Sequence, residues 1–228
     1  MKLSQRLQAI YDLVNSPCIL ADIGTDHGQL PIALVLDGKV EKAYACDVAQ
    51  GPLSRAAEAI QKANVQDKIQ TRLQNGLASL PNDVDSIVIA GMGSETIVSI
   101  LTNDLEYAKN IKQLILQSNV HVEILRRWLN QNGFQILHEE LVHEHHYYQI
   151  LNVTYGQQEL SEEQIQFGYD LYQHPLFEAW MNHQITGLER ILSHLPQNHE
   201  DYTSLHQRYE MMQRVLKKTV SKQSYKIC

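Results

Sequence analysis

The sequence predicts an α/β fold, a doubly wound sheet of mostly parallel strands, followed by a smaller helical part. Three observations lead to this prediction. Apolar strand-like runs alternate with helical patterns over the first two thirds of the chain, a glycine turn joins the first strand to its helix, and only helical periodicity remains after Gly156. Alternation of this kind indicates parallel strands connected by crossover helices.

The first part contains five predicted strand–helix units and ends in a two-strand hairpin, which is typical of a doubly wound sheet with an antiparallel edge. Apolar spacing predicts a helix over residues 2–14 before the first strand. Strands are expected at 18–23, 40–47, 69–73, 86–90, 114–116, 134–142 and 147–155, with helices from Leu30 onward and over 51–63, 95–101 and 121–131. In the last of these helices, Arg126 and Arg127 are expected to point outward.

The helical part has apolar residues at heptad spacing in two segments. Met181 to Leu195 step 4-3-4-3, and Tyr202 to Leu216 step 3-4-3-4. Because Pro196–Glu200 separates them, the pattern predicts an antiparallel hairpin with coiled-coil seams. A shorter helix is expected over 162–172.

Composition describes an ordinary globular chain of 228 residues, with 43% hydrophobic and 20% charged residues. Its length predicts one domain and a smaller appendage, which we expect at 1–157 and 158–228. No apolar run approaches the roughly 18 residues that span a bilayer, and no secretion leader is evident. We therefore expect a cytoplasmic protein without a membrane partner, in which Cys18 and Cys46 are buried thiols in a reducing compartment.

The turn after the first strand indicates which cofactor the sheet would hold. A pyrophosphate-binding turn needs Gly-x-Gly-x-x-Gly, but Asp26 occupies the place of the middle glycine. Asp22 on the strand adds a second carboxylate, and Asp47 follows Gly28 by 19 residues, close to the roughly 20 expected for a ribose-binding acid. Carboxylates repel phosphates and attract cations, so S-adenosylmethionine (SAM) is favoured over NAD-type cofactors or a purely structural turn.

Each residue of the turn has an expected role and an alternative. Asp22 would bind the methionine end of SAM, Asp47 its ribose, and Gly24 and Gly28 would allow close backbone approach. Asp26 and His27 are the candidate catalytic groups, able to stabilise charge or take a proton. Either could instead be an ordinary turn residue, since Asp often caps turns.

The sequence resembles the bacterial tRNA (adenine-22-N1)-methyltransferase family, often called TrmK. The matching motifs are Ala21-Asp-Ile-Gly-Thr-Asp-His-Gly28 with Leu30-Pro31, Cys46-Asp-Val48 with Gly51-Pro52-Leu53, Ile89-Ala-Gly-Met-Gly93, Leu116-Gln-Ser-Asn119, Arg126-Arg-Trp-Leu129 and Tyr147-Tyr148. The resemblance implies a Rossmann-like class I SAM methyltransferase domain, followed by a C-terminal α-helical coiled-coil domain. It also implies methyl transfer from SAM to N1 of adenine 22 in the tRNA D-arm region.

The resemblance further implies where cofactor and acceptor bind. Additional cofactor contacts are expected from Val48, Asn75, Gly76 and Gly91. The acceptor pocket is expected to comprise Met92, Gly93, Gln117, Asn119 and Tyr148. Alternatives stay open: Asn75-Gly76 could be a plain turn, Ser118 or Asn119 could cap the next helix, and Tyr148 could pack in the core. Methylation of a protein or small molecule, and a non-enzymatic tRNA-binding role, are the alternative functions.

Charge is unevenly distributed in this chain of net charge −7. From Leu205 to the end there is one acid, Glu210, against six basic residues: Arg208, Arg214, Lys217, Lys218, Lys222 and Lys226. A tRNA backbone could use such a patch, with Lys217 and Lys218 at its centre, although a solvated helix face is equally consistent. His143, His145 and His146 lack further ligands at metal-binding spacing, so no metal is expected. The oligomeric state stays open, a monomer included.

Overall fold

The computed structural model describes residues 2–77 and 79–224, with side chains described as far as residue 219. The chain divides into two compact units, Met1–Leu160 and Ser161–Cys228. Each unit is described by itself.

The first unit contains a seven-stranded sheet in the order β3-β2-β1-β4-β5-β7-β6. The first five strands along the chain are parallel, and β7 runs antiparallel to both of its neighbours. The doubly wound fold with an antiparallel edge is therefore confirmed. The strands are β1 (Ile19–Ile23), β2 (Lys42–Asp47), β3 (Ile69–Leu73), β4 (Ser86–Met92), β5 (Gln113–Ser118), β6 (Phe134–His143) and β7 (Tyr147–Tyr155).

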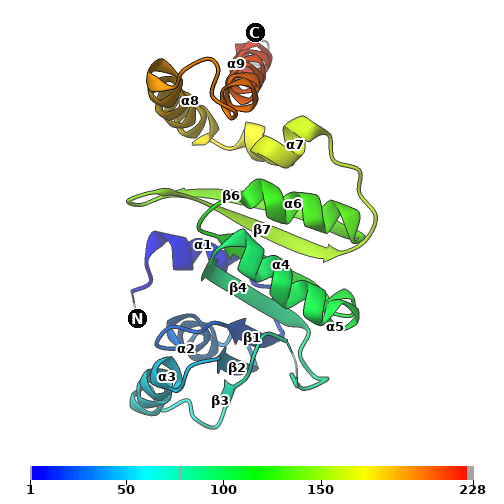
Figure 1. The fold of residues 1–228 in the computed structure, drawn as a ribbon. Coiled ribbons are helices and arrows are strands. Elements are labelled where there is room, and N and C mark those ends of the chain that lie inside the picture. The colour runs from blue at the N-terminus through cyan, green and yellow to red at the C-terminus, as the bar shows by residue number, and fades with distance from the viewer. Residues whose placement is uncertain (1, 78, 225–228) are drawn as a thin grey trace. The chain divides into compact units, whose positions relative to one another are not determined.

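Helices cover both faces of this sheet (Figure 1). The helices α1, α2 and α3 pack together on one face, and α4, α5 and α6 lie on the other. The short helix α5 was not predicted. The bounds are α1 (Gln5–Leu13), α2 (Gln29–Leu36), α3 (Gln50–Lys62), α4 (Ser94–Asn103), α5 (Leu105–Lys109) and α6 (Val122–Gln131).

The strand order places a crevice at the carboxyl ends of β1 and β4. Chain connections leave β1 in one direction along the sheet and β4 in the other, so the helices that follow these two strands lie on opposite faces. Ligands of open α/β sheets bind at such a switch point. The two strands are firmly held, because Leu20, Ala21 and Ile87 to Ile89 are almost completely buried.

Arg126 does not point outward as predicted. It is 0% exposed, and its Nε donates a hydrogen bond to Oε1 of the equally buried Glu139 on β6 at 2.6 Å. Its Nη2 also donates to Gln149 on β7. The prediction was wrong because helical periodicity assigns Arg to the solvent face, whereas here the sheet edge supplies a buried carboxylate. Arg127 is exposed, as expected.

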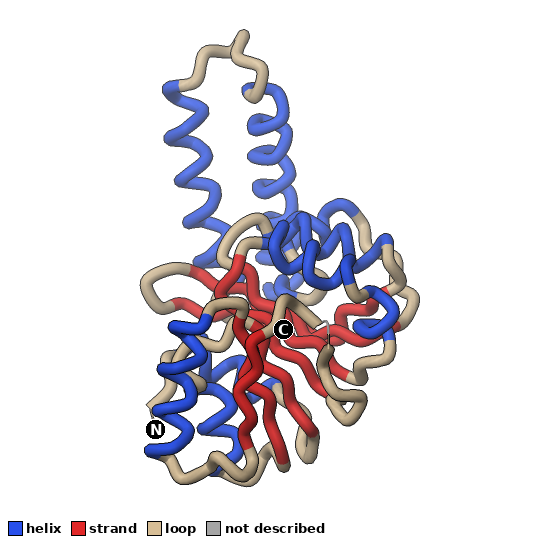
Figure 2. Tube along the Cα trace, turned by 60° about the horizontal axis from the view of Figure 1, so that its bottom comes forward, coloured by secondary structure: helices blue, strands red, loops and turns tan. Residues whose placement is uncertain are grey.

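The second unit is helical. Its elements are α7 (Glu162–Phe167), the 3₁₀ turn η1 (Leu171–Gln173), α8 (Phe177–His194) and α9 (Tyr202–Ser224). The single helix expected over 162–172 was wrong, because Gly168 adopts φ 109° and ends α7. Figure 2 shows α8 and α9 as two long helices side by side, joined by a loop at one end. Met181, Ile185, Leu188 and Met212 of the predicted seams are buried.

Within the part of the chain that the structure describes, no helix has both the length and the apolar character needed to cross a bilayer.

Removing one member of the Arg126–Glu139 pair should destabilise the first unit strongly. Arg126→Met or Glu139→Leu alone leaves a charge buried opposite an apolar group, which costs about 3–5 kcal/mol. The double variant Arg126→Met/Glu139→Leu should recover most of this loss. Urea unfolding followed by circular dichroism measures both effects.

The control is Lys109→Ala, which breaks an ion pair with the mostly exposed Glu106 and should leave the unfolding midpoint unchanged. Single variants as stable as the wild type would show that the buried pair does not support the fold.

Candidate functional site

The glycine turn after β1 is tied to the end of β2. The backbone N–H groups of Gly24 and Thr25 both donate to the carbonyl of Cys46, at 2.8 and 2.9 Å. Gly24 has φ +77°, a conformation in which a side chain would be strained. This tether places Asp22 and Asp47 close enough for their charges to interact.

Asp22 is a buried carboxyl group, 8% exposed, at the start of the turn. Burial raises its pKa to about 6, and the neighbouring Asp47 adds to this rise, while the side chain of Thr25 acts in the opposite direction. Thr25 itself is 1% exposed, and its side chain is near enough to Asp22 to lower the pKa of that carboxyl group, although its Oγ1 makes no hydrogen bond of standard geometry within the described residues. A desolvated acid next to a second carboxylate is the kind of site that a cationic ligand would stabilise.

A pocket of about 290 Å³ opens at the carboxyl ends of β1, β2 and β4. It brings together six residues predicted for the site: Gly24, Asp47, Val48, Asn75, Gly76 and Met92. The other lining residues are Ile23, Gln74, Thr96, Ser99, Ile100 and Asn103. Among these described lining residues Asp47 is the one charged group, so the pocket offers no lysine or arginine to a diphosphate.

The glycines of the turn have different surroundings. A Cβ on Gly24 would overlap the Met92 methyl group, so the backbone there leaves no room for a side chain unless Met92 moves. A Cβ on Gly28 would instead contact Ala56 and Ile60 of α3. Gly28, with φ +62°, thus starts α2 and faces a neighbouring helix, and it does not line the pocket.

Asp26 and His27 lie on the turn but outside the pocket lining. The Asp26 carboxylate is 76% exposed and lies 3.3 Å from His27 Nε2 and 3.8 Å from a nitrogen of Arg55 on α3. His27 adopts φ 56°, a region that non-glycine residues rarely occupy. The two side chains are therefore held together at the surface.

A second group of polar residues lies where β4 and β5 end. Gln117, completely buried, accepts hydrogen bonds at Oε1 from the Gly91 N–H at 3.0 Å and from Arg6 Nη1 at 2.6 Å. Its Nε2 donates to Asn119 Oδ1 at 3.1 Å. The Arg6 guanidinium also lies over the ring of Tyr148, 5.5 Å from its centre. This group joins four of the predicted residues: Gly91, Gln117, Asn119 and Tyr148.

Sequence reasoning missed Arg6. It lies on α1, far from every recognised motif, and its helical position gives no signal of a role. Only the packing of α1 near β7 and β6 brings its side chain to the ends of the central strands.

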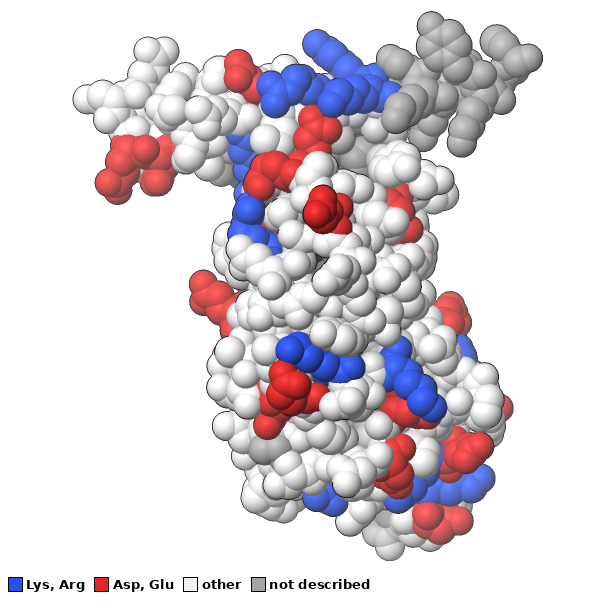
Figure 3. Space-filling view, turned by 90° about the vertical axis from the view of Figure 1, so that its right-hand side faces the viewer, with Lys and Arg blue, Asp and Glu red and all other residues white. Residues whose placement is uncertain are grey.

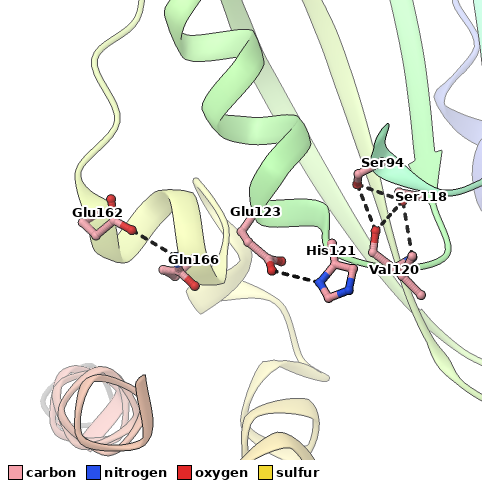
Figure 4. Close-up of polar contacts among 7 residues, drawn as sticks. All are labelled: Ser94, Ser118, Val120, His121, Glu123, Glu162 and Gln166. Atoms are coloured by element: carbon pink, nitrogen blue, oxygen red, sulfur yellow. Dashed lines mark hydrogen bonds and ion pairs between the residues drawn. The ribbon is translucent and has the colours of Figure 1, made fainter. Parts of the chain in front are cut away.

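The loop after β5 is held by its own hydrogen bonds, shown in Figure 4. Ser118 Oγ and Ser94 Oγ are 2.9 Å apart, and both donate to the carbonyl of Val120. Helix α6 begins after His121, which provides no side-chain cap and lies 3.4 Å from Glu123. Neither Ser118 nor Asn119 caps this helix, so that alternative is wrong. Gly93, at the start of α4, lies near Val120.

Lys217 and Lys218 are exposed on α9 in the second unit. Figure 3 shows lysine and arginine side chains gathered at the end of this helix. Lys218 Nζ donates to both carboxylate oxygens of Glu163, at 3.0 and 3.1 Å. The side chains of Lys222 and Lys226 lie outside the described residues.

The three histidines of the β6–β7 hairpin form no metal site with their neighbours. No group of three or more His, Cys, Asp or Glu residues that could hold a metal occurs among the residues that the structure describes. His143 stacks on Tyr147, and His146 meets the edge of Tyr148.

Comparison with known proteins identifies the family. A family model described as "Methyltransferase domain" matches residues 3–151. The tRNA (adenine(22)-N(1))-methyltransferase of Bacillus subtilis (strain 168) is 33% identical over 145 residues, 63% of this chain. The match spans only 61% of that relative's length.

Two solved structures are similar over nearly the whole chain. A candidate tRNA (m1A22) methyltransferase of Streptococcus pneumoniae, solved with SAM, is 36% identical with a TM-score of 0.88, covering 94% of this chain and 100% of that one. TrmK of M. capricolum, solved with S-adenosylhomocysteine, is 33% identical with a TM-score of 0.85, covering 95% and 99%. On these matches, the chain belongs to the methyltransferase-domain family and, within it, to the TrmK group.

Proposed function

We propose that this protein transfers a methyl group from SAM to N1 of adenine 22 in tRNA. The observation that carries the proposal is the pocket at the switch point of a TrmK-type fold, which is formed around Gly24, Asp47 and Met92 and has Asp47 as the charged group of its described lining. The activity named for the Bacillus subtilis relative supports the choice of acceptor.

The residues present fit SAM. Asp22 would bind the ammonium end of SAM, and Asp47 would bind the ribose hydroxyls. Val48, Asn75 and Gly76, which line the pocket, would border the adenine ring. When bound, SAM supplies an electrophilic methyl group on a positively charged sulfur. The nearby carboxylates suit this charge.

The acceptor side would receive an extruded adenine. N1 lies on the Watson–Crick edge, so the base must leave its stack, at a cost of a few kcal/mol. Gly91, Met92 and Gly93 would form the floor of the base pocket, and Tyr148 could stack on the base. Positioning supplies much of the acceleration, because the N1 lone pair needs no prior deprotonation.

Asp26 and His27 remain our candidates for stabilising the charge that develops on the methylated adenine. Their exposure at the rim suits contact with a large substrate. The Asp26 carboxylate is already shared with Arg55, which limits the charge that it can offer.

The second unit would bind the tRNA body. We propose that α8 and α9 form an antiparallel coiled coil, supported by the buried seam residues Met181, Ile185 and Leu188 and by the hydrogen bond from Tyr209 to Glu189 at 2.7 Å. Lys217 and Lys218 would contact phosphates. A cytoplasmic location agrees with this substrate and with the free, buried Cys18 and Cys46.

The direct test is incubation of the purified protein with SAM and unmodified tRNA, followed by mass-spectrometric mapping of modified nucleosides. We expect 1-methyladenosine at position 22. Parallel reactions contain a protein extract and a metabolite extract in place of tRNA. Methyl transfer confined to either extract would reject the tRNA assignment.

SAM affinity should depend on the ionisation of Asp22. The pKa of about 6 means that its carboxyl group is largely ionised at pH 7 and protonated at pH 5. The ammonium of SAM stays protonated over this range, so the affinity for SAM should change little near pH 7 and be about tenfold lower at pH 5 than at pH 7. Calorimetric titration between pH 5 and 7 measures this change.

Asp22→Asn should bind SAM weakly with little dependence on pH, yet the ligand-free variant should melt at a higher temperature at pH 7, because it no longer buries a charge. The exposed Asp67→Asn is the matched control and should keep the wild-type pH profile. A wild-type affinity that is flat from pH 5 to 7 would contradict the proposed contact.

The double variant Lys217→Ala/Lys218→Ala should weaken tRNA binding. The plot of log affinity against log salt concentration has a negative slope, and each lost phosphate contact reduces its magnitude by about 0.7–0.9. The magnitude of the slope should therefore decrease by up to about 2 in the double variant. Filter binding over a salt series gives the slope. The control variant Lys42→Ala/Lys112→Ala removes the same charge from the first unit and should keep the wild-type slope. Equal slopes for the wild type and both double variants would show that Lys217 and Lys218 do not contact tRNA phosphates.

A further inference from the structure

We propose that Arg6 is a positioning residue that orients the Asn119 amide to read the N6–N7 edge of the acceptor adenine. The inference rests on the proposed function and adds a specificity element to the same site. It begins from a continuous chain of hydrogen bonds that runs from Arg6 through Gln117 to Asn119.

The direction of this chain is dictated by its donors. A guanidinium can only donate hydrogen bonds, and so can a backbone N–H. Arg6 Nη1 and the Gly91 N–H both lie within hydrogen-bond distance of one atom of Gln117, at 2.6 and 3.0 Å, so that atom must be the acceptor oxygen Oε1. The amide of Gln117 therefore has one orientation.

The orientation of the Gln117 amide determines that of the Asn119 amide. Because Gln117 presents its NH₂ group, the atom of Asn119 that it meets at 3.1 Å must be Oδ1. The NH₂ group of Asn119 then donates to the carbonyl of Gly91 at 2.8 Å. The Asn119 backbone N–H donates to the Met92 carbonyl, also at 2.8 Å, which fixes the residue between the ends of β4 and β5.

Asn119 keeps one donor and one acceptor for a ligand. A carboxamide has two N–H donors and an oxygen that can accept two hydrogen bonds. Contacts with Gly91 and Gln117 use one of each, and the residue is exposed. One N–H and one lone pair of the Asn119 amide therefore remain for a ligand.

This remaining pair matches adenine at an edge that does not block methylation. Adenine offers an N6 donor next to an N7 acceptor, the pair that Asn typically binds with two hydrogen bonds. Reading this edge leaves N1 free for methyl transfer. Guanine has an acceptor, O6, at the place of N6, so the Asn119 oxygen would repel it.

Arg6 is itself held in place. Its guanidinium lies over the Tyr148 ring, and its backbone N–H donates to Glu144 Oε1 at 3.1 Å. The hydrogen bond from Arg6 lowers the pKa of the Glu144 carboxyl group, which keeps it ionised. Loss of the Arg6 side chain would remove one of the two donors that orient Gln117. The amide of Gln117 would then be less firmly fixed, and so would the amide of Asn119 that it contacts.

The test compares tRNA carrying adenosine or 7-deazaadenosine at position 22, since the deaza base lacks only the N7 acceptor. In the wild type, kcat/KM should be at least tenfold lower for the deaza tRNA. In Asn119→Ala the two tRNAs should differ by less than twofold, because the reading group is gone. In Arg6→Ala the difference in kcat/KM between the two tRNAs should shrink in the same way. Arg6→Lys, which can still donate to Gln117, should recover part of this difference.

Controls separate this role from folding and from the proposed function. Lys112→Ala, an exposed lysine before β5, should retain the full tenfold discrimination. SAM affinity by calorimetry should stay within threefold of the wild type in every variant, which a misfolded protein would not achieve. Equal wild-type rates on both tRNAs, or full discrimination in Asn119→Ala, would overturn the inference. A wild type that binds SAM but methylates neither tRNA would reject the proposed function itself.

Discussion

The site depends on one tether, the pair of hydrogen bonds by which the glycine turn after β1 is held to the carbonyl of Cys46. This contact brings a buried carboxyl group, Asp22, within electrostatic reach of Asp47 at the end of the neighbouring strand. Two acids this close raise the cost of ionising the buried one. A cationic ligand would offset this cost. The interaction between the two acids is therefore the physical reason for assigning a sulfonium cofactor to the pocket.

The acceptor side follows a different principle, in which neutral amides take the place of charges. Gln117 and Asn119 share hydrogen bonds with the backbone of Gly91, so the backbone turn and the side chains hold one another. In the proposed reaction, the carboxylates on the cofactor side would attract the positively charged methyl donor. The oriented amides on the acceptor side would distinguish the base.

Local patterns carried much of this information. The sheet, the turn and the pocket residues Gly24 and Asp47 were predictable because short-range glycine and acid spacing encodes a strand, a turn and a strand end, whereas Gly76 was expected only from the family resemblance. Gly28 lies in the predicted turn, but it was expected to allow close approach to the cofactor. In the structure it instead faces helix α3. The role of Arg6 was missed and the position of Arg126 was predicted wrongly, because their partners are more than ten residues away in the sequence. Arg6 contacts Gln117 on the interior strand β5, and Arg126 contacts Glu139 on the edge strand β6. Helical periodicity sorts side chains by face, and it does not reveal a buried acid opposite a basic residue.

The acids of the site, Asp22 at the end of β1 and Asp47 at the end of β2, should favour a cationic ligand and disfavour a diphosphate. Calorimetric titration of the full-length protein at pH 7.5 with SAM, and separately with NAD, tests it most directly. We expect a saturable one-to-one heat for SAM and none for NAD, with NAD unable to displace SAM. Saturable binding of NAD, together with no heat from SAM, would contradict this expectation.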